Sequence, residues 1–329
     1  MSYLTKYGTL YGLPVVQTGQ VFYVAPAASY TIAGRSFDAS NDNDGLSPER
    51  AIRDLNRFVT LATANVGDVA VLLEGTHTVT AVQRITKAGL TVVGVHDPYG
   101  PDDIRAVRPK SILTSTGTST VLLSVEANNF NMDYVTLRPT TGFSTVQFRN
   151  ASPNGTVFFR CYFDLQTPNP SVNTYGIDFG YRADSSDASG GSIAKASNTT
   201  TLATAYVRSC VFVAEGAQGR AMDIATAMVH VKDCWFHNTS GAWATPFSIA
   251  TAADGCVVEK SVWITSGTMG VCIDGTLASV ADGVHIIDCR FPRTGVITSG
   301  LVVDNFGSNE AQITESYQEG NATAVTTIT

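Results

Sequence analysis

The sequence feature that most restricts the fold is a short internal repeat: a small residue, Cys or Ser, followed two places later by an aromatic residue. The repeat occurs as Cys161-Tyr162-Phe163, Cys210-Val211-Phe212, Cys234-Trp235-Phe236, Ser261-Val262-Trp263 and Cys289-Arg290-Phe291. Successive small residues are 49, 24, 27 and 28 positions apart. Recurrence at this period is typical of solenoids, in which each repeat forms one coil and packs on the next.

A second strand pattern, apolar-x-apolar, precedes most copies of this repeat. It occurs as Val146-Gln147-Phe148, Ile177-Asp178-Phe179, Met222-Asp223-Ile224, Phe247-Ser248-Ile249, Val271-Cys272-Ile273 and Leu301-Val302-Val303. Each coil therefore has at least two strands whose side chains alternate inward and outward. Charged residues make up 15% of the chain, against about 25% in an ordinary globular domain, while Gly, Thr, Ser, Ala and Val are abundant, and this composition also favours an all-β fold.

One interval between the two strand patterns is much longer than the others. Phe179 and Cys210 are 31 residues apart, whereas Phe148 and Cys161 are 13 apart. The extra residues include the polar run from Ala183 to Gly191. We therefore expect one coil in the 49-residue interval to carry a protruding loop over residues 183–202.

A single helix is predicted over residues 48–64. Ser47 is a suitable N-cap and Pro48 suits the first helical position. The apolar residues Ile52, Leu55, Val59 and Ala62 then lie on one face, which can cover the open N-terminal end of the solenoid. The predicted organisation is an N-terminal arm (1–20), a lead-in segment with this capping helix (21–66), a β-helix (67–320) and a C-terminal tail (321–329).

Three segments carry a resemblance to a known group of proteins. They are Asp42-Asn43-Asp44-Gly45-Leu46-Ser47-Pro48-Glu49, Gly67-Asp68-Val69-Ala70-Val71-Leu72-Leu73-Glu74-Gly75 and Ala88-Gly89-Leu90-Thr91-Val92-Val93-Gly94. With the repeats, the chain from about residue 20 to 318 resembles the pectate-lyase-like right-handed parallel β-helix superfamily, and most of all bacteriophage tailspike and other virion β-helix proteins. The resemblance implies either attack on acidic polysaccharides or a rigid structural rod, often a homotrimer. Fold analogy does not choose between them.

The cysteines at the repeat position are predicted to form an inward ladder of free thiols. Cys161, Cys210, Cys234 and Cys289 share this position, and stacked strands place them about 4.8 Å apart per coil. No Cys-x-x-Cys motif or Cys/His cluster is present, so neither zinc nor any other cofactor is predicted.

Asp178 and Asp223 are the weak candidates for catalysis, because they occupy the same outward position on consecutive coils. Two carboxylates about 5 Å apart could serve a retaining glycosidase, chelate calcium, or simply face water. Arg149, Arg182 and Arg220 lie close to them in sequence. The polygalacturonase set of Asn-Thr-Asp, Asp-Asp, Gly-His-Gly and Arg-Ile-Lys is absent as a set, which argues against an enzyme, and no catalytic residue is assigned.

The acidic segment over residues 38–49 superficially resembles a calcium loop. Counted from Asp38, Glu49 stands at position 12, but Gly45 stands at position 8 where an EF-hand needs glycine at position 6. A turn rich in Asn, Asp and Gly is the favoured interpretation. An irregular calcium site is the alternative.

The outward residues inside the repeat form an unusual column, which comprises Tyr162, Val211, Trp235, Val262 and Arg290. Apolar side chains aligned over several coils form a strip that favours self-association, here as a homotrimer about a threefold axis. The alternative is that loops, including 183–202, cover it. The N-terminal arm adds Tyr3, Tyr7 and Tyr11 as candidate residues for docking to another protein.

Charge and the N-terminus narrow the choice of partners. The formal net charge of −7 argues against nucleic acid. The N-terminus lacks a signal-peptide pattern, and no apolar run approaches about 18 residues, so synthesis in a host cytosol without membrane insertion is expected.

The leading hypothesis is a bacteriophage virion component, a β-helical projection that stabilises the capsid or tail or contacts the host surface. Its partners would be capsid or tail proteins and host-surface polysaccharide. The alternatives are a polysaccharide depolymerase that uses Asp178 and Asp223, and a noncatalytic glycan-binding module that uses Trp235 and Trp243.

Overall fold

The computed structural model describes residues 9–10, 13–14, 19–95, 107–115, 121–139, 144–149, 154–165, 175–182, 204–215, 220–224, 228–243, 245–250, 253–277, 283–292, 296–303 and 312–318. Tyr3, Tyr7, Tyr11, the predicted loop 183–202 and the tail 321–329 lie outside these residues.

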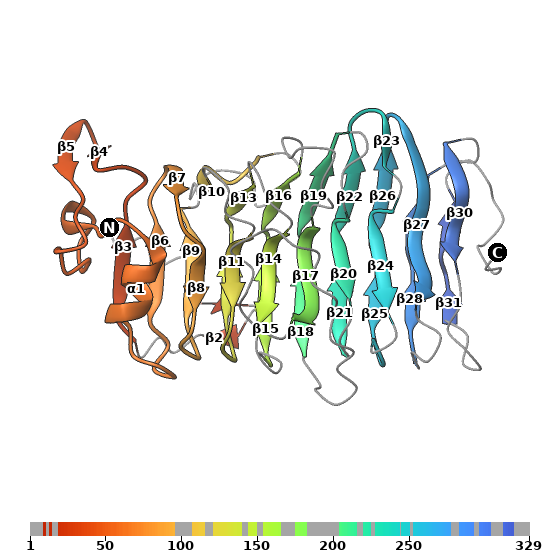
Figure 1. Cartoon of the computed structure of the whole chain (residues 1–329), viewed down its shortest axis with the longest axis horizontal. Coiled ribbons are helices and arrows are strands. Elements are labelled where there is room, and N and C mark those ends of the chain that lie inside the picture. Colours follow the sequence, from red (N-terminus) through yellow and green to blue (C-terminus); the bar gives the residue numbers. More distant parts are fainter. Residues whose placement is uncertain are drawn as a thin grey trace.

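Three parallel sheets run along the molecule, and from β6 onward the chain passes through them in the same order in each coil (Figure 1). Sheet 1 contains β3 (Val21–Val24), β6 (Val69–Leu72), β9 (Thr91–Gly94), β12 (Asn131–Asp133), β15 (Thr156–Phe159), β18 (Ala205–Arg208), β21 (Val229–Lys232), β25 (Val257–Glu259), β28 (His285–Ile287) and β31 (Gln312–Thr314). Sheet 2 contains β7 (Gly75–Val79), β10 (Ser111–Ser115), β13 (Thr136–Arg138), β16 (Tyr162–Asp164), β19 (Val211–Ala214), β22 (Trp235–Asn238), β26 (Val262–Thr265), β29 (Arg290–Phe291) and β32 (Tyr317–Gln318). Sheet 3 contains β8 (Gln83–Ile85), β11 (Val121–Val125), β14 (Ser144–Arg149), β17 (Tyr175–Arg182), β20 (Met222–Ile224), β24 (Phe247–Ala250) and β27 (Thr268–Leu277), with β23 (Ala242–Trp243) and β30 (Ile297–Val303) paired to β27.

The strands of each sheet pair in parallel from coil to coil, so the predicted parallel β-helix is confirmed. Parallel connections of this kind are right-handed in nearly all known sheets. Two antiparallel hairpins complete the described strands: β1 (Thr9–Leu10) with β2 (Leu13–Pro14), and β4 (Ser29–Ile32) with β5 (Arg35–Asp38).

The repeat residues pack inside the coils as predicted. All six cysteines are free and buried, and each ladder Sγ lies 3.3–3.6 Å from two backbone carbonyl oxygens. Burial raises the pKa of Cys210 well above its ordinary value and that of Cys289 to about 12, so these thiols are protonated and unreactive at neutral pH.

The aromatic residues of the repeat form one continuous stack. Centroid distances along Phe163, Phe212, Phe236, Trp263 and Phe291 are 4.4, 5.3, 4.8 and 4.9 Å. Stacked rings of this kind contribute beyond their burial, so the stack fixes the register between coils.

From β12 onward, each described corner from sheet 1 to sheet 2 places one residue in the left-handed region, directly before the ladder position. The residues are Tyr134, Arg160, Ser209, Asp233, Lys260, Asp288 and Glu315, with φ between 49° and 55°. This conformation costs a non-glycine residue about 1 kcal/mol or more. Hydrogen bonds between coils offset that cost; for example, the Asp233 N–H donates to the Glu259 carbonyl oxygen at 3.0 Å.

The capping helix is shorter than the predicted range of 48–64. A 3₁₀ turn covers Pro48–Arg50, and the helix α1 covers Leu55–Leu61 with Asp54, not Ser47, as its N-cap. The two are separated because Ile52 pairs with Val24 at the edge of sheet 1 and accepts a hydrogen bond from the Ala25 N–H at 2.9 Å. The predicted apolar face is buried, and α1 packs against β8 and β3 at the N-terminal end (Figure 1).

His77 makes the stability of the fold depend on pH. It is 3% exposed, and its Nε2 lies 2.7 Å from the Leu73 carbonyl oxygen. Burial lowers its pKa to about 4. The pKa in the unfolded chain is about 6.5, so the stabilisation is present above that value and is lost as the pH falls toward 4.

Wild-type protein should therefore lose about 2 kcal/mol of unfolding free energy through His77 between pH 7 and pH 5. A His77→Gln variant should lack this component, because its side chain does not titrate. Urea unfolding of both proteins at the two pH values measures the difference. Identical pH dependence in wild type and variant would contradict the assignment.

Candidate functional site

The structure brings the candidate acids into one outward column on sheet 3. Asp178 and Asp223 are register partners on β17 and β20, and the column continues through Ser248 to Asp274. Their strand neighbours Ile177 and Met222 belong to the core. Adjacent strands lie about 4.8 Å apart, so the expected spacing of the carboxylates holds at the backbone level.

These acids are not surface groups. Asp178 and Asp223 both have 0% exposure, so the alternative in which they simply face water is wrong. Arg220 spans the column, with its guanidinium 3.7 Å from Asp223 Oδ1 and 4.0 Å from Asp274 Oδ2. Buried charges require such partners, and a substrate has no direct access to either candidate acid in this conformation. Arg149 and Arg182 are register partners of each other on β14 and β17.

The predicted apolar strip on sheet 2 is partly covered within a single chain. Val211 is 5% exposed and packs in a cluster with Tyr134, Val213, Tyr162 and Trp235. The outer side of the Tyr162 ring is covered by the Arg108 guanidinium, whose central carbon lies 4.6 Å from the ring centroid.

Other members of this column differ in exposure. Val262 is half-buried and Arg290 is exposed. Trp243, expected to be an exposed aromatic, is completely buried because β23 closes onto the core.

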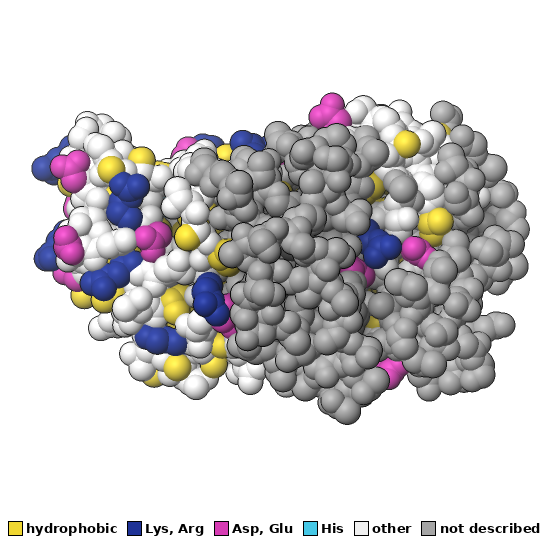
Figure 2. All heavy atoms as spheres, in the orientation of Figure 1, with side chains coloured by type: hydrophobic (Ala, Val, Ile, Leu, Met, Phe, Trp, Pro, Cys, Tyr) yellow, Lys and Arg dark blue, Asp and Glu magenta, His cyan; other side chains and the backbone are white. Residues whose placement is uncertain are grey.

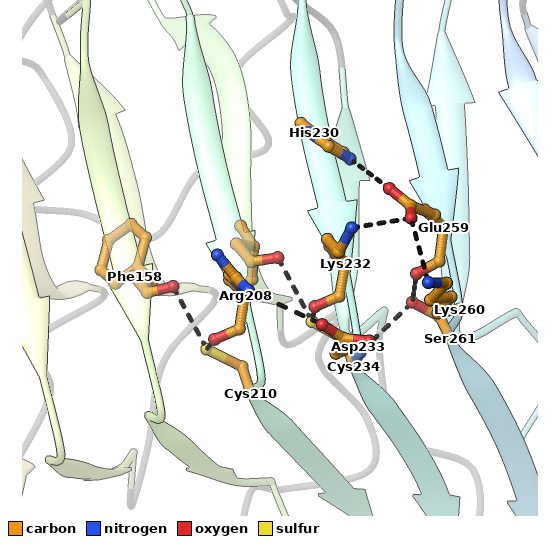
Figure 3. A network of polar contacts seen from close by, with 11 residues as sticks. Phe158, Arg208, Cys210, His230, Lys232, Asp233, Cys234, Glu259, Lys260 and Ser261 are labelled. Atoms are coloured by element: carbon orange, nitrogen blue, oxygen red, sulfur yellow. Dashed lines mark hydrogen bonds and ion pairs between the residues drawn. The ribbon is translucent and has the colours of Figure 1, made fainter. Parts of the chain in front are cut away.

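An accessible cluster of charged and aromatic side chains lies along the corner between sheets 1 and 2, and Figure 3 shows its charged members with His230. We call it the corner cluster; it comprises Tyr206, Arg208, His230, Lys232, Asp233, Glu259 and Lys260. Glu259 is its centre, 2.7 Å from Lys232 Nζ, 3.3 Å from His230 Nε2 and 3.8 Å from Lys260 Nζ. The hydrogen bond from Lys232 is the main cause of a lowered pKa for Glu259.

Several of these side chains remain open to solvent. Tyr206 is 47% exposed, and the side chains of Arg208 and Lys260 are 43% and 52% exposed. Tyr206 pairs in register with His230, and Arg208 pairs with Lys232, which in turn pairs with Glu259, so the members form two adjacent rows across neighbouring coils. An aromatic face beside three cations and two carboxylates can bind a polar, anionic ligand through charge and ring contacts.

Sequence reasoning missed this cluster although the repeat contained its signal. The two positions before the small residue of each repeat hold Phe159-Arg160, Arg208-Ser209, Lys232-Asp233, Glu259-Lys260 and Ile287-Asp288. The polarity of most of these residues is visible in the sequence. That they form adjacent rows depends on the corner geometry, which the small and aromatic positions alone do not specify.

The acidic segment at 38–49 makes local contacts. Asn41 Nδ2 donates to Asp54 Oδ2 at 2.7 Å, Leu46 N–H donates to Asp44 Oδ1 at 3.1 Å, and Asp44 pairs with Arg50 at 3.1 Å. Within the described ranges, no group of three His, Cys, Asp or Glu side chains is placed to hold a metal ion.

The similarity of this chain to known proteins is a similarity of backbone structure. No protein-family model and no curated protein matches the chain. Among solved structures, it is similar to a pectin methylesterase from Yersinia enterocolitica (TM-score 0.48, 10% identity, 89% of this chain and 93% of that chain). It is also similar to a rhamnogalacturonan lyase (TM-score 0.35, 14% identity, 88% and 75%) and to the GH136 lacto-N-biosidase from Eubacterium ramulus (TM-score 0.32, 8% identity, 91% and 67%).

At these levels of similarity no residue role is transferred to this chain. The pairing of its own strands defines it as a parallel β-helix protein. No helix in the described residues is long and apolar enough to cross a membrane.

Proposed function

We propose that this chain is a rigid β-helical rod that contacts an acidic polysaccharide through the corner cluster. The observation that supports the proposal most directly is the pair of cations Arg208 and Lys232, which are register partners on neighbouring coils, beside the exposed ring of Tyr206. A polymer with repeating charges can contact both cations at once, which favours several weak contacts over one deep pocket.

The acid column supports a depolymerase as the second candidate. Register pairing of Asp178 with Asp223 gives the spacing that a retaining glycosidase needs, but their burial opposes direct attack on a polymer. Release of reducing sugar or of unsaturated uronate from a polysaccharide panel tests this candidate. Activity that disappears in Asp178→Asn and Asp223→Asn would favour the depolymerase.

Replacing Arg208 and Lys232 together with alanine should weaken binding to polygalacturonate or to a bound capsular polysaccharide about tenfold. Each accessible ion pair with the polymer contributes up to about 1 kcal/mol, and 1.4 kcal/mol corresponds to tenfold in Kd. Affinity electrophoresis with the wild-type and variant proteins at two salt concentrations measures the effect, which should shrink at high salt.

Lys110→Ala is the matched control, because Lys110 is 60% exposed and lies directly before β10, outside the corner cluster. Its affinity should stay within twofold of the wild type. Equal losses in Lys110→Ala and in the double variant would show a general charge effect and contradict the site.

We also propose that the rod is a projection on a bacteriophage capsid or tail, present as a homotrimer. The resemblance of the three N-terminal segments to virion β-helix proteins and the elongated stack of coils support this placement. Immunogold labelling of purified particles should place the protein on the capsid or tail. Sedimentation should give about three times the 34.8 kDa chain mass; a single-chain mass at micromolar concentration would contradict the trimer.

A further inference from the structure

A cavity of about 310 Å³ lies at the N-terminal end of the rod, away from the corner cluster. Its floor is the outward face of the first coils of sheet 1, including Tyr23 and Val71, with Val95 just beyond β9. One wall is the β4–β5 hairpin, which projects from this end in Figure 1. Cavities of this size that combine apolar and polar lining groups are typical of binding sites for small groups.

The wall of the cavity is the edge of a strand. All four consecutive residues of β4, Ser29–Ile32, line the cavity, so the cavity adjoins the strand's edge and not only one face. Among the described strands, only β5 pairs with β4.

The hydrogen-bond pattern shows which backbone groups point to that edge. The Ala39 N–H donates to the Ala28 carbonyl oxygen at 2.7 Å, which makes Ala28 and Ala39 a hydrogen-bonded pair. Pairs alternate along antiparallel strands, so Tyr30 bonds to Phe37, and the N–H and C=O groups of Ser29 and Thr31 point away from β5.

The hairpin is held in place, so this edge is preorganised. The Tyr30 hydroxyl donates to the Pro48 carbonyl oxygen and accepts from the Ala51 N–H at 3.3 Å. Ala33 and Gly34 form its two-residue turn with φ of 48° and 79°, the conformation that matches the twist of a hairpin. On the far strand, the Asp38 carbonyl oxygen already accepts from Asn43 Nδ2 at 3.3 Å.

The basic and acidic side chains of the N-terminal coils are interspersed on the face seen in Figure 2, so charge alone does not select a ligand at this end. Near the cavity, however, Glu74 lines the rim and is 60% exposed even though its carboxylate pairs with Lys110 Nζ at 3.3 Å. The exposed carboxylate can accept a second cation, which favours a ligand that carries a positive charge beside its apolar part.

We propose that the β4 edge and this cavity form a docking site for an extended peptide segment of a partner protein. The segment adds a strand along Ser29–Ile32, donates to and accepts from the backbone of Ser29 and Thr31, and places one bulky apolar side chain in the cavity. Main-chain hydrogen bonds give affinity in this mode of recognition, and the pocket gives specificity. A Lys or Arg near the buried side chain then lies beside Glu74.

The test begins with selection from a displayed library of random heptapeptides on the full-length protein. The enriched sequences should share one bulky apolar position with a basic residue near it. The best synthetic peptide is then titrated against the wild type and three variants by fluorescence anisotropy. Val71→Glu places a charge in the cavity floor, Thr31→Pro removes an outward N–H from β4, and Ser36→Pro does the same on the far edge of β5.

Binding should weaken at least tenfold in Val71→Glu and in Thr31→Pro and stay within twofold in Ser36→Pro, with melting temperatures of the two proline variants alike. Equal binding by the two proline variants would overturn strand addition. That result would also be expected if the cavity takes only a small molecule or a sugar. Failure to enrich any peptide would overturn the docking site. Polysaccharide binding at the corner cluster is unaffected by these outcomes, so the two proposals are tested separately.

Discussion

Replacing Phe236 with alanine is expected to lower the free energy of unfolding by about 3–5 kcal/mol. Phe236 is fully buried in the middle of the aromatic stack, 5.3 Å from Phe212 and 4.8 Å from Trp263, with Phe247 packed edge-on at 5.7 Å. Both neighbours in the stack belong to other coils, so the substitution removes contacts between coils and leaves a cavity that the surrounding strands cannot close. Urea unfolding followed by circular dichroism measures the loss.

Tyr206→Ala provides the control for this measurement. Tyr206 is also aromatic and lies on a strand in the same region, but it is 47% exposed, so its removal should change stability by less than about 0.5 kcal/mol. Similar small effects for the two variants would mean that the stack does not hold the coils together. The difference in unfolding free energy between Phe236→Ala and Tyr206→Ala thus distinguishes inward positions of the repeat from outward ones.

The repeat predicted the interior of the molecule because the interior depends on side-chain type and period. Cys or Ser fills a narrow position near the corner, and an aromatic two residues later points to the same side, since strand side chains alternate. Both positions therefore return to the core in each coil, as Cys234 and Phe236 do. A pattern of two residues was enough to identify the parallel β-helix and its free thiols.

The limits of the helix were harder to predict for a local reason. Ile52 has the spacing of a helical core residue, yet it forms a parallel bridge with Val24 and interrupts the helix. Tertiary pairing overrides helix propensity at such a position. The sequence between Pro48 and Leu61 contains both signals, and only the position of β3 decides between them.

The exterior could be predicted only in part, because burial there depends on what covers each sheet. Asp178 and Asp223 were expected to be neighbours and are register partners, but their complete burial follows from the surrounding chain and not from their own pattern. The corner cluster depends on left-handed residues such as Asp233 and Lys260. Asp enters this region more readily than most residues, but Lys has no such preference, so side-chain type alone does not mark the corners.

Removing the guanidinium of Arg160 is expected to destabilise the fold by about 3–5 kcal/mol, because it leaves a buried carboxylate without its ion-pair partner. Arg160 donates to both oxygens of Asp133, from Nε at 3.0 Å and from Nη2 at 2.6 Å. The Asp133 side chain is 2% exposed and the Arg160 side chain 20%, so water replaces little of the lost interaction. Arg160→Ala measured by urea unfolding near pH 7 gives the size of the loss.

The double variant Asp133→Asn with Arg160→Ala should recover part of that loss, since a neutral amide has a smaller desolvation cost than a carboxylate. Lys110→Ala, which breaks an ion pair whose two side chains are each 60% exposed, should change stability by less than about 1 kcal/mol. A loss in Arg160→Ala no larger than that in Lys110→Ala would contradict a structural role for the pair. Arg160 occupies the same left-handed corner position as Asp233 and Lys260. A large loss would therefore show that this column of corner residues serves two purposes. Its buried ion pairs hold neighbouring coils together, and its exposed members present charge to a ligand.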